Sequence, residues 1–367
     1  MSSTTQRHAI APATVLRGKG VWVGSIPQIV ELSQQPFLLG RSSTTAALRQ
    51  RLQSDLQKAG LAVSSGELEF DCCEQDLQRL TAEIKSSGSD IVLAAGGGKV
   101  LDAGKLLAER LALPCVTVPT SAATCAGWTA LANIYSPQGA FESDVALRHC
   151  PELLIFDHDF VVQAPARTLA SGIADAMAKW YEASISSGSS GDGLVQQAVQ
   201  QARVLRDQLL LEGLEAIEQP GGEAWKRVAE ASGLTAGLIG GMGGARCRTV
   251  AAHAVHNGLT QLAACHGVLH GEKVGFGILV QLRLEEQLGG SQLAAQARRQ
   301  LFSFFRQLHL PVSLEELGLA AASLQELKEV CHFACRDGSD LHHLPFAVSP
   351  DDLLSALVSS SQGCLTH

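Results

Sequence analysis

The first half of the chain alternates short apolar runs with amphipathic stretches. Runs with the length and composition of buried strands lie at residues 37–40, 91–95, 115–118 and 153–156, and another strand is expected between residues 61 and 70. Helical periodicity separates them, over residues 43–59, 74–85 and 100–111. Strands that alternate with helices of this length predict a parallel sheet with crossover helices.

After Pro165 the pattern becomes helical throughout. Ala- and Leu-rich segments with a helical period are expected at residues 168–187, 192–216, 223–240, 248–264, 272–287, 291–308, 323–335 and 350–361. No convincing strand interrupts them. The sequence therefore predicts an α/β domain over residues 1–164 and an all-α domain over residues 165–367.

Length and charge agree with two domains and exclude some functions. A chain of 367 residues is too long for one ordinary core. Its net charge of −8, with no basic block, argues against a nucleic-acid surface. The stretch from Leu111 to Phe141 carries no charge, but it contains three prolines, so we expect a buried strand and a ligand-lining loop rather than a membrane helix.

The ten cysteines are scattered along the chain, and the N-terminus lacks the apolar segment of a signal peptide. Scattered cysteines in a chain without a secretion signal are typical of reduced thiols. We therefore expect a cytoplasmic protein.

A glycine-rich turn, Gly96-Gly97-Gly98-Lys99, separates an expected strand from an expected helix. Without Cβ atoms, such a turn lets a pyrophosphate reach the backbone N–H groups at the helix N-terminus. Asp102 and Lys105 follow on that helix and are expected to brace the loop. A glycine turn without a ligand is the alternative, and the turn follows the third expected strand rather than the first, unlike the usual dinucleotide motif.

Small hydroxylated residues follow the next strand, in the run from Pro119 to Cys125. Such residues at the carboxyl end of a strand suit a cofactor crevice, although an ordinary loop is an equal alternative.

Histidines gather in one part of the helical half. His253 and His256 lie three residues apart, His266 follows, and His270 begins another expected helix. Asp175 is a lone charge in an apolar helical stretch and needs a partner if it is buried. Histidine and carboxylate suit a catalytic zinc or iron with an open position, and separate core histidines with a capping aspartate are the alternative.

The remaining candidates are weaker. Cys331, His332 and Cys335 have the spacing of a ligand group, but core thiols on an amphipathic helix are the better interpretation. His342 and His343 belong either to the border of a cleft or to a surface turn.

Five segments together resemble the glycerol dehydrogenase group of the iron-containing alcohol dehydrogenase superfamily, which is related in fold to dehydroquinate synthase. They are GGGKVLDAGK (96–105), VPTSAATCAGWTALANIY (118–135), APARTLASGIADAMAKWYEA (164–183), AAHAVHNGLT (251–260) and HGEKVGFGILVQ (270–281). The resemblance runs from about residue 36 to the end. Within the group, the AATCA-W-T loop is similar to that of the hydroxycarboxylate dehydrogenase branch.

The resemblance implies a Rossmann-like N-terminal domain, a helical C-terminal domain and a deep cleft between them. It implies NAD(P) and one divalent metal, with zinc favoured over iron, held by Asp175, His253 and His270. His256 then becomes a cleft residue and a candidate proton relay. The implied dinucleotide contacts are Gly96, Gly97, Gly98, Lys99, Thr120, Ala123, Thr129, Leu131 and Tyr135.

Two residues depart from the pattern of glycerol dehydrogenases. Cys125 stands where that group has an aspartate that contacts the polyol, and Arg41 lies at or beside the aspartate that binds the adenosine ribose. The first change favours a small 2-oxo acid over glycerol, with Arg246, Arg248 or Lys273 as candidates to reach its carboxylate. The second change favours acceptance of NADP.

The sequence thus predicts an NAD(P)-linked, metal-dependent dehydrogenase that acts on a small polyol or a 2-hydroxy acid, and we expect a homo-oligomer. A strict NAD-linked glycerol dehydrogenase is one alternative. A dehydroquinate synthase-like lyase is another, but it needs basic residues that the loop from Thr120 to Trp128 lacks. A non-catalytic dinucleotide-binding relative is the alternative of another class, and retention of all three implied ligands argues against it.

Overall fold

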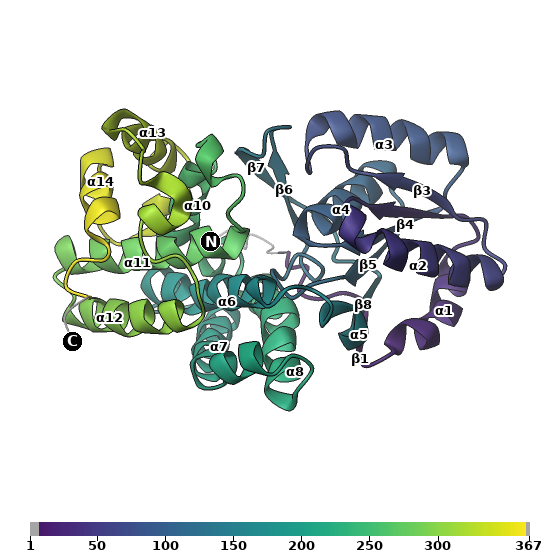
Figure 1. The fold of residues 1–367 in the computed structure, drawn as a ribbon, viewed down its shortest axis with the longest axis horizontal. Coiled ribbons are helices and arrows are strands. Elements are labelled where there is room, and N and C mark those ends of the chain that lie inside the picture. Colours follow the sequence, from purple (N-terminus) through teal and green to yellow (C-terminus); the bar gives the residue numbers. More distant parts are fainter. Residues whose placement is uncertain (1–6, 365–367) are drawn as a thin grey trace, which may run out of the picture.

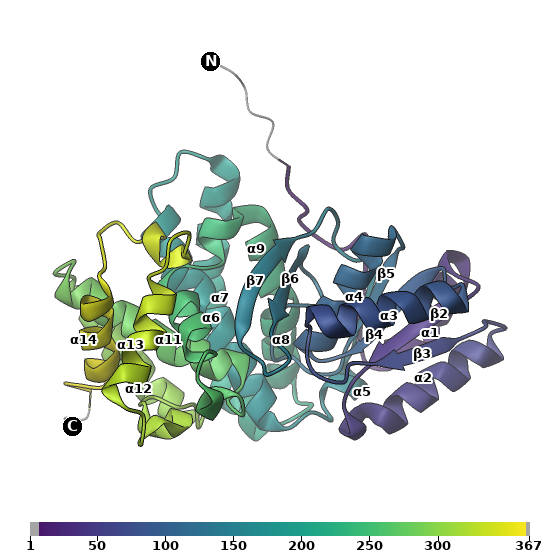
Figure 2. The same ribbon diagram turned by 90° about the horizontal axis from the view of Figure 1, so that it is seen from above.

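A computed structural model describes residues 7–364. Its sheet-containing half and its helical half lie side by side in two perpendicular views (Figures 1 and 2). The strands are β1 (Thr14–Gly18), β2 (Pro36–Gly40), β3 (Ser64–Glu67), β4 (Ile91–Gly96), β5 (Cys115–Pro119), β6 (Leu131–Tyr135), β7 (Phe141–Ala146) and β8 (Leu153–Asp157).

Helices separate and then follow the strands. Those of the sheet half are α1 (Val21–Leu32), α2 (Ala46–Lys58), α3 (Glu74–Ser87), α4 (Gly98–Leu111) and α5 (His158–Val161). Those of the helical half are α6 (Ala166–Ser187), α7 (Gly193–Glu218), α8 (Glu223–Glu230), α9 (Ala236–Gly243), α10 (Ala251–Leu259), α11 (His270–Gln287), α12 (Gln292–Gln307), α13 (Leu324–Ala334) and α14 (Pro350–Ser359).

Six strands form one parallel sheet in the order β1-β8-β5-β4-β2-β3. Alternate side chains of its central strands enter opposite layers, as the pleat requires. Phe37 and Leu39 pack with α3 and α4, whereas Leu38 packs with α1 and α2. Both faces are thus covered, which explains why these strands are apolar along their whole length.

The carboxyl ends of β4 and β5 lie next to each other. Gly96 pairs with Pro119, and the N–H of Thr120 donates to the carbonyl of Gly96 at 3.0 Å. The glycine turn and the hydroxylated loop therefore meet at one edge of the sheet, where open α/β folds bind ligands.

An antiparallel hairpin, β6–β7, connects the two halves. The N–H of Phe141 donates to Thr260 Oγ1 at 2.9 Å, and Gln261 Nε2 donates to the carbonyl of Phe141 at 3.0 Å. Figures 1 and 2 show this hairpin between the sheet and the helices.

The predicted fold class is confirmed, and several elements differ from the expectation. The structure adds β1, α1 and the hairpin, so the glycine turn follows the fourth strand in chain order rather than the third. β1 lies at the sheet edge and is half-exposed, which hides the apolar run of a strand. The helix expected over residues 223–240 contains a wide π-helical turn at Ala231–Thr235.

After Asp157 the described chain contains helices and turns but no strand. The predicted boundary at residue 164 lies between α5 and α6, and the division into two domains stays a prediction. None of the helices in residues 7–364 is both long and apolar enough to span a bilayer. All ten cysteines are free thiols.

Candidate metal centre and cofactor cleft

A cavity of about 1370 Å³ lies between the carboxyl edge of the sheet and the helical half. Its walls come from the ends of β4 and β5, from the hairpin and from α6, α10 and α11. Every site residue that the sequence predicted lines it: Arg41, Gly96, Gly97, Gly98, Lys99, Thr120, Ala123, Cys125, Thr129, Leu131, Tyr135, Asp175, His253, His256 and His270. Their proximity is a structural finding, and their roles are proposals.

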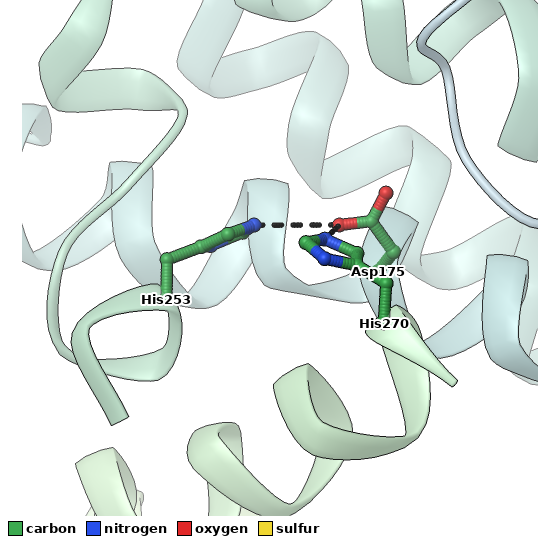
Figure 3. A group of neighbouring side chains, drawn as sticks. All are labelled: Asp175, His253 and His270. Carbon is green, nitrogen blue, oxygen red and sulfur yellow. Dashed lines mark ion pairs between the residues drawn. The ribbon is translucent and has the colours of Figure 1, made fainter. Parts of the chain in front are cut away.

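Asp175, His253 and His270 converge on one point of this cavity (Figure 3). They come from three different helices, α6, α10 and α11. The Nε2 atom of each histidine lies 3.4 Å from Asp175 Oδ1, and the potential ligand atoms all lie within 4.8 Å of one another.

These distances fit a metal better than direct hydrogen bonds. A spacing of 3.4 Å is long for an imidazole–carboxylate bond. It is close to the edge of a tetrahedron with bonds of about 2.1 Å, the length of zinc–nitrogen and zinc–oxygen bonds. Two imidazole nitrogens and one carboxylate oxygen leave a fourth position for a substrate, so the three residues fit a catalytic divalent metal.

Glu182 fixes the orientation of His253. It is fully buried, and its Oε2 lies 2.6 Å from His253 Nδ1. Its Oε1 accepts the N–H groups of Val250 and His253 at 2.7 and 3.0 Å. With Nδ1 held by this carboxylate, Nε2 is the nitrogen that faces Asp175, as expected for a metal-binding histidine.

The charges of these groups act on one another. Burial alone would lower the pKa of His253, but the negative charges of Glu182 and Asp175 outweigh it and raise that pKa to about 9. Burial would raise the pKa of Asp175, but Lys179 and the two histidines hold it well below its usual value.

Close helix packing positions the three side chains. A Cβ on Gly271 would lie 1.8 Å from the carbonyl oxygen of Ser171, so only glycine lets the start of α11 approach α6 here. A Cβ on Gly172 would lie 1.9 Å from the carbonyl oxygen of Ala122, which brings the hydroxylated loop onto the same helix. Gly172, which follows Ser171, and Gly271, which follows His270, thus set the width of the site.

His256 lies beside the group. Its ring centroid is 4.2 Å from that of His270, and its Nδ1 pairs with Asn257 Oδ1 at 2.9 Å. Burial, followed by the charges of His270 and Lys273, holds the pKa of His256 well below its usual value. A neutral imidazole with Nδ1 engaged leaves Nε2 as an acceptor.

The glycine turn is open toward the cavity. Gly97 precedes α4, and a Cβ placed on it would meet nothing within 4 Å. Lys99 pairs with the buried Asp71 and lies 5.5 Å from the ring centroid of Tyr135. The turn can therefore receive a phosphate on its N–H groups, with an ammonium beside it.

Asp102 and Lys105 brace the segment before the hairpin rather than the glycine turn. Lys105 Nζ lies 3.0 Å from Asp102 Oδ1 and donates to the carbonyls of Thr129, at 3.0 Å, and Leu131. Asp102 Oδ2 accepts the N–H of Asn133 at 3.2 Å. This buried pair fixes two of the predicted cofactor contacts.

Arg41 follows β2 and lines the cavity from the sheet half. The hydroxyls of Ser42 and Thr44 line the same region and lie 2.7 Å apart. Arg49 holds this loop from behind, since it donates to the carbonyl of Ser42 at 2.9 Å and pairs with Glu67. Arg41 itself forms no hydrogen bond or ion pair with any residue in the described part of the chain.

The weaker candidates do not form a second site. Among residues 7–364, the three metal-centre residues are the one His/Cys/Asp/Glu group compact enough to hold an ion. Cys331 is buried in the helical core and His332 is exposed. His266 Nε2 pairs with the carbonyl of Thr260 at 3.1 Å, and His343 lies 3.4 Å from the carbonyl of Thr249.

Sequence reasoning missed Lys179 and Glu182. With Asp175 they lie at positions i, i+4 and i+7 of one helix, so the three charges share a face within an apolar segment. That spacing is a signal that the sequence contained.

Of the residues expected to reach a substrate carboxylate, Arg248 lines the cavity. Lys273 donates to the carbonyls of Cys265 and Val268, and the side chain of Arg246 lies outside the described part.

Comparison with known proteins gives relatives along the whole chain. The pattern of the family described as iron-containing alcohol dehydrogenase matches residues 12–158. An uncharacterised oxidoreductase of Synechocystis sp. is 51% identical over 96% of this chain and 91% of its own length. A glycerol dehydrogenase of Pseudomonas putida is 35% identical over 89% and 87%. Hydroxycarboxylate dehydrogenase A of Escherichia coli is 36% identical over 78% of each.

A solved structure agrees with these relatives. The crystal structure of a probable glycerol dehydrogenase from Sinorhizobium meliloti superposes with a TM-score of 0.87, at 27% identity, over 99% of this chain and 100% of that one.

The contact between Glu182 and His253 predicts a pH dependence of stability in metal-free protein. The folded pKa of about 9 lies above the usual value of 6.5, so the contact stabilises fully below pH 6.5 and loses its effect as the pH rises through 9. We expect Glu182→Gln to lower the free energy of unfolding by about 2 kcal/mol at pH 6 and much less at pH 10. Urea unfolding at both pH values measures this difference.

The matched control is the exposed Glu223 replaced by Gln. This variant should not show a destabilisation at pH 6 that disappears at pH 10. A Glu182→Gln effect that is equal at both pH values would contradict the assignment.

Proposed function

The chain belongs to the iron-containing alcohol dehydrogenase family, and from this premise we propose that its substrates are small 2-oxo acids and the corresponding 2-hydroxy acids. It is an oxidoreductase that acts on CH–OH groups, as its relatives are. The family uses NAD(P) and a divalent metal. The observation that carries the choice of substrate is the neutral Cys125 in the cavity wall beside Asp175.

Cys125 makes this wall unfavourable for a polyol. Burial raises the pKa of its thiol, so the group carries no charge at neutral pH. A thiol is a poor hydrogen-bond acceptor, and a polyol hydroxyl buried against it would be left poorly paired, at a cost of about 1–3 kcal/mol. A substrate carboxylate at the same place meets no negative side chain on the loop from Thr120 to Trp128. The E. coli relative named hydroxycarboxylate dehydrogenase is consistent with this choice.

We propose that Asp175, His253 and His270 hold the metal, and that the metal is zinc rather than iron, although two imidazoles and one carboxylate suit both ions. A divalent ion bound there supplies a Lewis acid for the oxygen of the substrate. Glu182 keeps His253 in the tautomer with a free Nε2. The ring of His256 contacts that of His270, and its Nε2 is the proposed acceptor of the hydroxyl proton during oxidation and its donor during reduction.

The dinucleotide is proposed to extend from Arg41 to the metal centre. The N–H groups at the start of α4 receive its pyrophosphate, and Lys99 lies beside them. Thr120, Ala123, Thr129, Leu131 and Tyr135 are the further contacts proposed along the cavity. The enclosing walls from both halves exclude water from the reacting carbon.

Cytoplasmic location and assembly into a homo-oligomer stay predictions. The proposed partners are small molecules alone.

Replacing His270 by Ala should remove the bound metal and the dehydrogenase activity, because one of three ligands is lost. Metal content measured by mass spectrometry and NAD(P)H oxidation measured optically are the readouts, with circular dichroism to show an intact fold. The exposed His332, replaced by Ala, is the control and should keep both. An active, metal-free His270→Ala protein would refute the assignment.

NADP should be used at least as well as NAD, because the free Arg41 guanidinium, with Ser42 and Thr44, can pair with a 2′-phosphate. The ratio of kcat/KM for the two cofactors is the measurement, and Arg41→Ala should shift it toward NAD by about tenfold or more. Arg203→Ala, at an exposed site, should leave the ratio unchanged. A tenfold preference of the wild type for NAD would rule out this role.

The proposed substrate class is tested by competition in the reductive direction. The wild type should have a higher kcat/KM for 2-oxobutanoate than for dihydroxyacetone, and Cys125→Asp should reverse the order by adding a like charge and a hydrogen-bond acceptor. If the wild type already prefers dihydroxyacetone, a glycerol dehydrogenase is the better conclusion. If no carbonyl in a panel supports the oxidation of NAD(P)H, a non-catalytic dinucleotide-binding protein is the better conclusion.

A further inference from the structure

Lys179 is a buried cation that no hydrogen bond or ion pair of the described chain contacts directly. Its side chain is 4% exposed, and it lines the cavity one helical turn after Asp175 on α6. Within the described chain, no atom forms a hydrogen bond with its Nζ, and no carboxylate lies within 4 Å of it. An ammonium that is largely removed from bulk water and faces a cavity favours an anion bound beside it.

The nearby carboxylates are engaged elsewhere. Asp175 Oδ1 faces the two histidine nitrogens at 3.4 Å. Both oxygens of Glu182 are occupied by His253 and by two backbone N–H groups. Cys125, the remaining polar neighbour of Lys179, is a neutral thiol. Burial would lower the pKa of Lys179, but the charge of Asp175, one helical turn away, outweighs it. No anionic group of the described chain is in contact with the ammonium, which faces the cavity.

A second cation lines the same wall. The aliphatic stem of Arg248 packs against α9, where a Cβ on Gly240 would lie 3.0 Å from its Cγ and Cδ. Its guanidinium has no hydrogen-bond or ion-pair partner among residues 7–364, and it acts electrostatically on Lys179. Two cations that repel each other and face the same space are the arrangement expected of an anion-binding subsite.

We propose that Lys179, assisted by Arg248, binds the carboxylate of the substrate beside the metal centre. This inference rests on the proposed function. It gives a role in substrate binding to Lys179, a residue that the geometry of the metal centre does not require. Four residues of α-helix advance about 6 Å, so Lys179 lies about that far along α6 from Asp175. In a 2-oxo acid the carboxylate is bonded directly to the carbonyl carbon, which suits neighbouring subsites for the two groups.

The dinucleotide is another source of negative charge, but its pyrophosphate has its own site. The glycine turn and Lys99 lie on the sheet side of the cavity, whereas Lys179 and Arg248 lie on α6 and before α10 in the helical half. The experiment therefore separates substrate anion from dinucleotide by measuring each without the other.

The test compares two substrates that differ in one group, 2-oxobutanoate and 1-hydroxy-2-butanone. Removing the charge with Lys179→Gln should lower the ratio of their kcat/KM values by roughly 10- to 150-fold, the range for a hydrogen bond to a charged group. The loss should appear chiefly in KM for the acid. Lys179→Arg should restore most of the ratio, and Lys85→Gln, at an exposed position on α3, should leave it unchanged.

Calorimetry of the metal-loaded enzyme without dinucleotide gives a readout independent of turnover. Binding of 2-hydroxybutanoate should be strongly weakened by Lys179→Gln, while binding of NADP alone should change less than threefold. Metal content of each variant shows that Asp175 still holds the ion. If Lys179→Gln does not fold, Arg248→Gln takes its place, with a smaller expected fall in the ratio.

The outcomes separate the two proposals. A ratio that changes less than threefold in Lys179→Gln, with 2-hydroxybutanoate still bound, overturns the subsite. A wild type that reduces neither carbonyl overturns the substrate class, and the calorimetric comparison then decides alone whether Lys179 binds a carboxylate. Loss of NADP binding instead would assign the cation to the dinucleotide and overturn the proposal.

Discussion

The structure depends on the burial of three charges on one face of α6. Asp175, Lys179 and Glu182 lie in an apolar helix at the centre of the helical half, where an unpaired charge costs several kcal/mol. Glu182 is compensated by the backbone at the start of α10 and by His253, which fixes that helix relative to α6. Asp175 is compensated by Lys179 on the same helix and by His253 and His270, and the contact with His270 fixes α11. The same contacts therefore determine both the packing of these helices and the geometry of the metal centre.

The same requirement links the two halves. The hydroxylated loop after β5 lies against α6 because Gly172 has no side chain to meet the carbonyl of Ala122. On the other side, the glycine turn meets the same loop, with Gly98 close to Thr124. The cavity thus has a glycine-rich wall from the sheet, where we propose that phosphate binds, and an ionic wall from the helices, and it is also lined by Cys125. Hydride transfer needs both walls at a fixed separation, which rigid elements provide better than mobile loops.

The cations that line the cavity differ in whether a carboxylate pairs with them. Near the glycine turn, Lys99 is neutralised by Asp71, so a phosphate there relies mainly on backbone N–H groups. On the sheet side of the cavity Arg41 has no ion pair in the described chain, and on the helical side neither Lys179 nor Arg248 has one. Unpaired cations at two separated places suit a ligand set with negative charge at both ends, a 2′-phosphate and a substrate carboxylate.

The sequence alone determined the fold class, because periodicity of apolar residues is a local property. Apolar runs of strand length found the four most buried strands, and helical periodicity found the main helices of the second half. It missed β1 and the hairpin, because an edge strand and a bridging strand are half-exposed and show no continuous apolar run. Motifs also selected the residues that now line one cavity, through resemblance rather than through geometry.

Only the tertiary structure decided which charges have partners. Spacing alone leaves His253, His256, His266 and His270 equivalent, and only the resemblance to a family distinguishes them. The fold brings the Nε2 atoms of His253 and His270 to Asp175 and turns His266 to a backbone carbonyl. Lys273, a candidate to reach the substrate carboxylate, is bound by two carbonyls. Lys179, which the sequence did not single out, is a buried cation without a hydrogen bond or ion pair in the described chain. Pairing depends on distances between segments about a hundred residues apart, and no local pattern contains them.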